Sequence, residues 1–211
     1  MITEEILIGK VRMLLGEASG DSGVSLITDD TLQLDKHIKA LLPEAVLFVQ
    51  MNKASGVVNV KCTISCDVNV NSVVGGVVVT LPTDYVRLVA LKLSCWDTAC
   101  HVTFPAGSKM DAIQRNKYLR AGKASPACIE GVDDANRVIL TAYPVHSDDD
   151  VSLENFIYEA RYNEGEGITG GDEALVKAVA YQCAALLCNV LEKPECANTF
   201  QTYAAALCNN K

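Results

Sequence analysis

The stretch "VNVKCTISCDVNVN", residues 58–71, gives the clearest structural signal in the chain. Apolar or sulfur-bearing side chains alternate with polar ones along its length, which is the period of a β-strand with one dry and one wet face. As a single strand it would span about 45 Å, which is long for a compact domain. We therefore expect a long hairpin, in which "VVVTLP" (residues 77–82) returns after a turn near Gly75 and Gly76.

Two helical patterns precede this run. Residues 2–17 bring apolar side chains near one face of a first helix, and a cap at Thr28 or Asp29 begins a second helix that ends near Met51. Pro43 falls inside the second helix, where it lacks an amide hydrogen and clashes with the preceding turn. We expect a kink or a new helix start at this proline.

Further strand-like runs follow, and then two helices end the chain. Turn-forming residues separate strands that we expect at residues 84–96, 100–105, 126–131, 136–145 and 153–163, with a short helix at residues 108–119. From Asp172 apolar residues recur at helical intervals to about Leu191, and Pro194 opens a last helix.

The order of helices, strands and helices predicts an α+β fold rather than alternating βαβ units. We expect a helical bundle, formed by the N-terminal helices and the C-terminal helical pair, with an inserted, mainly antiparallel β domain or long β-hairpin. Residues 1–55 hold the N-terminal helices and residues 56–165 the β-rich insertion. Residues 172–211 hold the C-terminal helices, which pack on residues 1–55 in a single composite domain.

The bulk composition argues against several classes of protein. A chain of 211 residues with 49% hydrophobic residues is not disordered, and apolar runs such as residues 73–81 are too short to span a bilayer. A net charge of −8 with scattered Lys and Arg argues against a surface that grips phosphate. The acidic start lacks the basic head of a secretion signal, so we expect synthesis in the cytosol. We expect the nine cysteines, an odd number, to be reduced and mostly buried thiols.

Gly165, Gly167 and Gly170 spell the G-x-G-x-x-G pattern of dinucleotide-binding turns. That site needs a second parallel strand ending in an acidic residue about 20 residues further on. Glu192 falls near this distance, but it lies between two helices and no strand precedes it. The pattern therefore predicts a hinge-like loop between a sheet and a long helix, not a cofactor site.

Two further stretches contain residue types typical of catalytic or metal sites, but neither has the arrangement that such a site needs. Ser22 lies in "GDSG", the nucleophile stretch of chymotrypsin-like proteases, but no His or Asp of that kind precedes it in the chain. A second candidate is a zinc site formed by Cys95, Cys100, His101 and Cys128, because thiolates and an imidazole are ligands that zinc prefers. The spacing of these residues along the chain is untypical of a zinc site. Two further cysteine pairs are too far apart along a strand or around a helix to share an ion: Cys62 with Cys66, and Cys183 with Cys188.

No other residue suggests a reaction. The three histidines have no sequence partner that indicates catalysis; they are His37, His101 and His146. Trp96 is spaced like a core or interface residue. We expect no catalytic, cofactor-binding or metal-binding residue, and no enzymatic activity.

Two short stretches carry a family resemblance. "LPTDYVRLV" (residues 81–89) and "NKYLRA" (residues 116–121) resemble stretches of head–tail connector (adaptor or neck ring) proteins of tailed bacteriophages. The similarity is strongest to ring proteins of the crAss-like phages of gut Bacteroidota. An early long helix, a β insertion and a closing helical pair extend the resemblance over most of the chain.

The resemblance implies a structural virion protein that forms a ring of twelve copies beneath the portal. Such a ring extends the channel for double-stranded DNA without reading its sequence, joins portal to tail, and involves no membrane. It implies assembly into the virion after synthesis in the host cytoplasm. Two alternatives stay open: a small nucleotide- or zinc-dependent enzyme that uses the glycine loop or the Cys95–His101 cluster, and another phage tail-completion protein.

Overall fold

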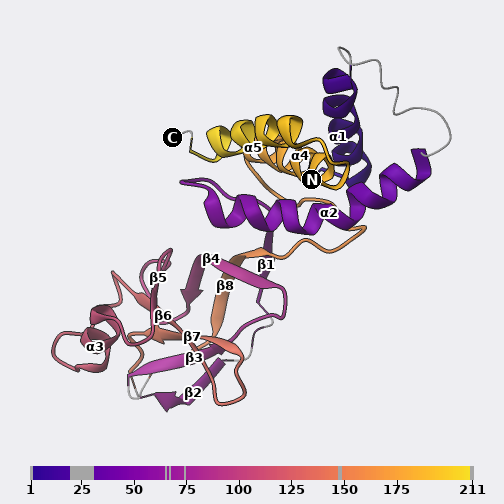
Figure 1. The fold of residues 1–211 in the computed structure, drawn as a ribbon. Coiled ribbons are helices and arrows are strands. Elements are labelled where there is room, and N and C mark those ends of the chain that lie inside the picture. Colours follow the sequence, from indigo (N-terminus) through magenta and orange to yellow (C-terminus); the bar gives the residue numbers. More distant parts are fainter. Residues whose placement is uncertain are drawn as a thin grey trace. The chain divides into compact units, whose positions relative to one another are not determined.

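The computed structural model describes residues 2–19, 31–64, 66, 68–73, 75–146 and 149–209. The chain divides into two compact units (Figure 1). The helical unit comprises Met1–Val60 and Ala160–Lys211, and the β unit comprises Lys61–Glu159. Because the β unit is one continuous segment, the helical unit is assembled from both ends of the chain.

The helical unit contains α1 (Glu4–Ser19), α2 (Thr31–Asn52), α4 (Glu173–Val190) and α5 (Pro194–Asn209). Helix α4 packs against the other three helices (Figure 1). Its side chains supply much of one continuous apolar core. The helix begins at Asp172, whose carboxylate accepts a hydrogen bond from Ala174 N at 3.0 Å, as the sequence predicts. The expected cap of α2 at Thr28 or Asp29 lies outside the described residues.

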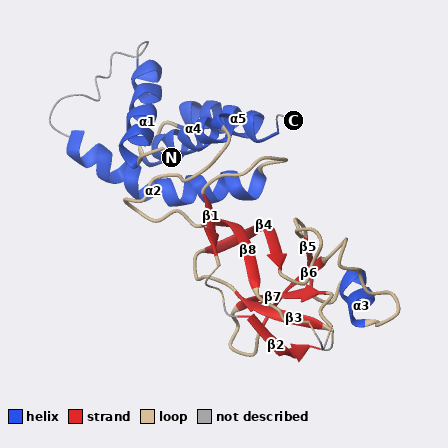
Figure 2. Ribbon diagram, turned by 180° about the vertical axis from the view of Figure 1, so that it is seen from behind, coloured by secondary structure: helices blue, strands red, loops and turns tan. Residues whose placement is uncertain are grey.

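Helix α2 is a single helix with Pro43 inside it. Its axis bends along its length (Figures 1 and 2). A proline ring removes one hydrogen bond and clashes with the preceding turn, which kinks a helix without ending it. Of the two expected outcomes, the structure therefore has the kink.

The apolar composition of helix α4 follows from its burial in the core of the helical unit. It is long and apolar enough to cross a membrane, contrary to the expectation that no apolar run is sufficient, but 61% of that stretch is buried inside the helical unit. A core helix of a globular unit meets the same criteria of length and composition.

The β unit holds most of the strands in two sheets (Figure 2). The three-stranded sheet has the order β1-β8-β4, formed by Val60–Thr63, Leu153–Ala160 and Tyr85–Leu93. The five-stranded sheet has the order β2-β3-β7-β6-β5, formed by Val68–Val73, Gly76–Thr80, Val138–Tyr143, Ala127–Val132 and Thr103–Pro105. In the five-stranded sheet β5 and β6 are parallel and the other pairs antiparallel. Helix α3 (Lys109–Arg115) lies next to β5 and β6.

The alternating run 58–71 is not one strand, so the expected hairpin with its turn near Gly75 is present but shorter than predicted. Strand β1 ends at Thr63 and joins the three-stranded sheet, whereas β2 begins at Val68 and joins the five-stranded sheet. Only β2 and β3 form the hairpin, with Val73 opposite Gly76 and Gly75 at a φ of 74° in the turn. Alternation sets which way side chains point, but it does not choose the strand that supplies the hydrogen bonds.

The α+β class is confirmed. Across the described residues, five helices and two sheets of mainly antiparallel strands follow in the predicted order, with helices at both ends and the strands between α2 and α4.

Candidate functional site

The glycine-rich loop, residues 161–171, leads into α4 in the helical unit. Gly165, Gly167 and Gly170 have φ angles of 86°, 71° and 63°, in the left-handed region that favours glycine. The three glycines are therefore explained by the backbone conformation of the loop.

Several N–H groups of this loop donate to other parts of the helical unit. Gly165 N donates to the Glu4 carboxylate, and Ile168 N donates to Ile2 O at 2.9 Å. Thr169 N donates to Asn59 Oδ1 at 3.3 Å. A phosphate cradle needs such N–H groups free and aimed at the ligand. Helix α4 leads to α5 rather than to a second parallel strand. The geometry thus favours a structural junction over a dinucleotide site.

Asn59 is the centre of this junction, although the sequence pattern placed it on the wet face of a strand. It is 2% exposed and has a φ of 57°. Its Nδ2 donates to Ala160 O at 2.9 Å and to Arg161 O at 3.1 Å. Its Oδ1 accepts from the amide and the hydroxyl of Thr169, both at 3.3 Å. Asn59 thus joins the loop to the segment after β8.

Glu4, in the first turn of α1, holds the other side of the loop. It is buried, and its Oε1 lies 3.2 Å from Lys39 Nζ on α2. Burial and the neighbouring Glu4 raise the pKa of Tyr162. A loop fastened to α1 and to Asn59 has little freedom to act as a hinge.

The structure brings together only two of the four residues weighed for zinc. In the β unit the Cys128 side chain is the main cause that lowers the pKa of Cys100, and Cys100 Sγ donates to Val102 O at 3.3 Å. His101 is exposed, and its Nδ1 lies 2.9 Å from Val89 O. Cys95 lies near Asp149, and burial is the main cause that raises its pKa. Within the described ranges, no three His, Cys, Asp or Glu side chains converge in a way that could hold a metal ion.

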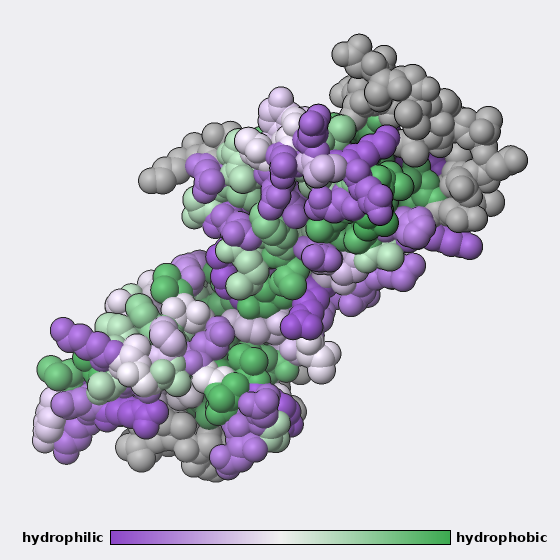
Figure 3. All heavy atoms as spheres, in the orientation of Figure 1, coloured by the Kyte–Doolittle hydropathy of each residue, from purple (hydrophilic) through white to green (hydrophobic). Residues whose placement is uncertain are grey.

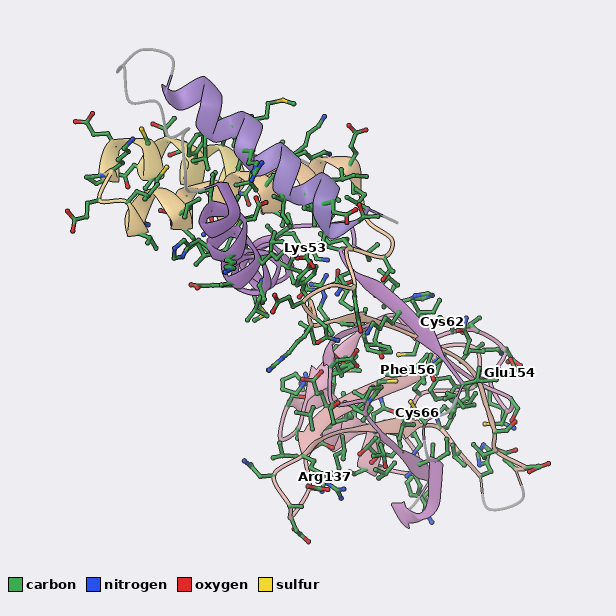
Figure 4. All side chains as sticks on the ribbon, turned by 90° about the vertical axis from the view of Figure 1, so that its right-hand side faces the viewer. Lys53, Cys62, Cys66, Arg137, Glu154 and Phe156 are labelled. Atoms are coloured by element: carbon green, nitrogen blue, oxygen red, sulfur yellow. The ribbon has the colours of Figure 1, made fainter. Side chains whose placement is uncertain are left out.

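The other cysteines are also free thiols. Cys183 and Cys188 are buried in α4, and burial raises the pKa of Cys183 to about 12. Cys62 lies on β1 and is exposed, and Cys66 lies beyond the end of that strand (Figure 4). The expectation of mostly buried thiols therefore holds for five of the nine, which are Cys100, Cys128, Cys183, Cys188 and Cys208.

The remaining candidates have structural surroundings. Trp96 is buried, and its Nε1 donates to Pro144 O at 2.8 Å. His37 and His146 are exposed. Ser22 lies outside the described residues.

A pocket of about 500 Å³ opens in the β unit between β5, α3 and residues 119–127. Its wall is mostly apolar, and Cys100 contributes a thiol to it. Gln114 and Ser125 add polar groups to the lining. No sequence pattern indicates this pocket, because its lining comes from three segments that only the fold brings together.

The residues of "LPTDYVRLV" fix the β unit internally. Asp84 accepts from Lys61 Nζ at 2.9 Å and from Tyr158 Oη at 3.0 Å. The ring of Tyr85 stacks on Phe156 with 6.2 Å between centroids. The buried Glu159 lies 3.4 Å from Arg87 Nε. The residues of this stretch therefore make contacts that hold the β unit together.

The stretch "NKYLRA" ends α3 and fixes the chain after it. Asn116 is the C-cap of α3, and Arg120 Nε donates to Gln114 O at 2.7 Å. Tyr118 is 82% exposed and Leu119 is 63% exposed. Two large apolar side chains thus project from the β unit.

An exposed apolar stripe runs along α1, formed by Ile6, Gly9, Met13 and Gly16 (hereafter the α1 stripe). Ile6 is 51% exposed and Met13 66% exposed, while an added Cβ at either glycine would meet no atom within 4 Å. The residues recur at helical spacing, on the side away from the buried Leu7 and Val11. Apolar surface is visible on the helical unit in Figure 3.

No protein-family model matches this chain, and no curated protein matches it.

Proposed function

We propose that this protein is a structural component of the head–tail connector of a tailed bacteriophage. It forms a ring of twelve copies between portal and tail, and the packaged DNA passes through the lumen. The proposal starts from the resemblance of "LPTDYVRLV" and "NKYLRA" to phage ring proteins. It places the working protein in the virion, after synthesis in the host cytoplasm.

The observation that carries the proposal furthest is the α1 stripe. Met13 is 66% exposed, so a single copy leaves this apolar helix face in water. Glycine at an exposed helix position costs about 1 kcal/mol relative to alanine, which favours a role such as close approach of another chain. A ring joins two different faces of identical copies, and an unpartnered apolar face suits one half of that contact.

Two further observations support a structural role. The residues that carry the resemblance hold the β unit together through contacts such as Asp84 with Tyr158 and Tyr85 with Phe156. The net charge of −8 suits a channel wall that must let DNA slide.

The test is the mass of the assembly. The full chain is purified alone and after co-expression with the portal protein of the same phage, and each sample is measured by light scattering and native mass spectrometry. We expect a closed ring in at least one sample, with the copy number given by the mass. A protein that stays monomeric in both samples and binds no portal contradicts the proposal.

A further inference from the structure

Residues 109–123 (hereafter the basic segment) concentrate positive charge in an acidic chain. They comprise helix α3 and the loop after it, and they carry five cationic residues against one carboxylate, a net charge of +4. Because the whole chain carries −8, the residues outside the segment sum to −12. The five cations are Lys109, Arg115, Lys117, Arg120 and Lys123. Such a local excess of one sign favours a partner surface of the other sign.

Carboxylates of the same unit engage only part of this charge. Arg115 pairs with Asp111 at 2.8 Å, and Lys123 pairs with Asp149 at 2.7 Å. Lys109 and Lys117 are exposed, and the Lys117 ammonium lies 4.8 Å from the centre of the Tyr118 ring rather than on a carboxylate. The two lysines thus present their charge to the surroundings of the β unit.

The basic segment also carries apolar surface at the pocket of the β unit. Tyr118 is 82% exposed and Leu119 63% exposed. Leu119 lines the pocket of about 500 Å³, and so does Val102, which is itself exposed. The basic segment, Val102 and the pocket therefore form one surface that is both basic and apolar (hereafter the pocket face).

The helical unit carries a surface of the opposite charge beside the α1 stripe. Residues 163–173 have a net charge of −4, from four exposed carboxylates and no cation: Glu164, Glu166, Asp172 and Glu173. Hydrogen bonds to Ile2 and Glu4 fasten this segment to the start of α1. Glu5 and Ile6 are exposed on the same first turn. The α1 stripe therefore begins next to an acidic surface.

We propose that the pocket face of one copy binds the α1 stripe and residues 163–173 of a second copy. The inference rests on the proposed function, and it names the two surfaces that meet in the ring. A head-to-tail ring needs two different and complementary surfaces on each copy. Here the net charges of +4 and −4 would orient the copies, and Ile6 and Met13 would supply apolar side chains to the pocket.

DNA is the other partner that a basic segment can bind, but a second copy fits this surface better. Binding to phosphates relies on Lys and Arg, and local carboxylates already engage two of the five cations. An apolar pocket with the exposed Leu119 at its edge offers nothing to a phosphate backbone. A second copy matches both the charge and the apolar surface.

The first test is cross-linking between copies of the full chain. Unlabelled and heavy-isotope-labelled copies are mixed in the dissociated state and then assembled, alone or with the portal protein of the same phage. A carbodiimide couples lysine amines to carboxylates in contact, and only links of mixed isotope join two copies. We expect mixed links from Lys109 or Lys117 to residues 163–173. Assembled copies whose mixed links never join these two segments overturn the inference.

The second test uses one charge reversal on each surface. Lys117→Glu and Glu164→Lys should each weaken association by about ten-fold or more, because each brings like charges together. At a concentration where neither variant associates alone, their mixture should give a one-to-one dimer in native mass spectrometry, because one complete contact remains. Lys36→Glu, on the exposed side of α2, is the matched control and should assemble like the unmodified chain.

The outcomes separate this inference from the proposed function. A ring whose assembly is unchanged by Lys117→Glu and Glu164→Lys contradicts the inference alone. Copies that pair through these surfaces without closing a ring support the inference and contradict the ring, and a chain that stays monomeric with and without portal contradicts both. If Lys117→Glu assembles normally but binds a labelled DNA duplex more weakly, the basic segment faces DNA and the inference is wrong. The cross-links of the unmodified chain decide the contact even if a variant does not fold.

Discussion

Gly167 combines a left-handed backbone with a site that has no room for a side chain. Its φ is 71°, and an added Cβ would lie 2.5 Å from Ile2 O and 3.1 Å from Thr3 Cα. Both neighbours are backbone atoms, so they move only if the start of α1 moves. We predict that Gly167→Ala lowers the free energy of unfolding by more than the ~1–2 kcal/mol that a left-handed alanine costs. Urea denaturation followed by circular dichroism measures the loss.

Gly165→Ala is the matched control, because Gly165 has a φ of 86° but open space around an added Cβ. This variant should lower the free energy of unfolding by only the ~1–2 kcal/mol that alanine costs in a left-handed backbone conformation. Equal losses in the two variants would show that the contact with Ile2 does not matter.

Cys100 should titrate near neutral pH. Its pKa is lowered to about 7 by the Cys128 thiol, which faces it from β6, and by His101 next to it in the chain. The rate of its alkylation by iodoacetamide should therefore rise through a midpoint near pH 7, since only the thiolate reacts. Cys183, whose burial raises its pKa to about 12, should stay slow over the same range. A midpoint for Cys100 at or above pH 9 contradicts the prediction.

At the scale of residues, the sequence predicted types of environment but not neighbours. It indicated that most cysteines are thiols in or near the core, and that Asp172 caps a helix. It placed Asn59 in water, because alternation alone marks polar positions as exposed. Asn59 is buried since three segments supply carbonyl and amide partners for its side chain. Cys128 likewise acquires Thr103 as its neighbour only when β5 and β6 pair.

Among the elements, α3 is too short to be stable by itself and depends on Asp111. This carboxylate accepts from Gly107 N at 2.8 Å and from Arg115 Nε at 2.8 Å. Asp111→Asn removes the charge and one acceptor from a buried position, which should cost about 1–3 kcal/mol of unfolding free energy. Denaturation at pH 7 measures the cost. Asp134→Asn is a control, because Asp134 is an exposed aspartate of the same unit and should change stability little.

The effect of Asp111 should depend on pH with a definite sign. The hydrogen bond from Arg115 is the main cause that lowers the pKa of Asp111 in the folded protein. The stabilisation is therefore complete above the unfolded value of about 3.9 and is lost as pH falls through the lower folded value. The stability difference between the unmodified protein and Asp111→Asn should shrink over that acidic range. A difference that stays constant down to pH 2 would argue against the ion pair as its source.

Element type followed from the sequence better than element partners. The helices after Asp172 have the expected bounds to within about one residue, and the strand expected at residues 84–96 is β4, which ends earlier, at Leu93. The break between β1 and β2 was missed, because period two continues from Val60 through Val70 while the hydrogen-bonding partner changes from β8 to β3. The alternation of apolar and polar residues does not encode which strand a residue pairs with. The parallel pairing of β5 with β6 is absent from the local pattern for the same reason.

At the scale of the whole molecule, the chain should unfold in parts. The β unit, Lys61–Glu159, is continuous in sequence and has its own sheets and aromatic cluster. A segment with its own core can fold alone. We predict that residues 61–159, expressed alone, give the circular dichroism of a β protein and a cooperative thermal transition. A fragment without cooperative unfolding would show that the β unit needs the helical unit.

The proposed ring makes its sharpest prediction at the α1 stripe. Met13 is 66% exposed in one copy, so a charge at this position costs the isolated chain little. Buried in a contact between copies, the same charge would be unpaired and desolvated. Met13→Glu should therefore weaken each contact by about ten-fold or more, equivalent to ~1.4 kcal/mol. Native mass spectrometry of the protein, alone or with portal, should show smaller assemblies than the unmodified chain forms.

Gln201→Glu, on the exposed side of α5, adds the same charge to another helix of the helical unit and serves as control. Circular dichroism and thermal melting should show that both variants fold. If Met13→Glu assembles as well as the unmodified chain, the α1 stripe is not a contact between copies. If both variants fail to assemble, net charge rather than the stripe governs assembly, because the chain already carries −8 and each variant adds one negative charge. Only a loss confined to Met13→Glu assigns the face of α1 to the neighbouring copy.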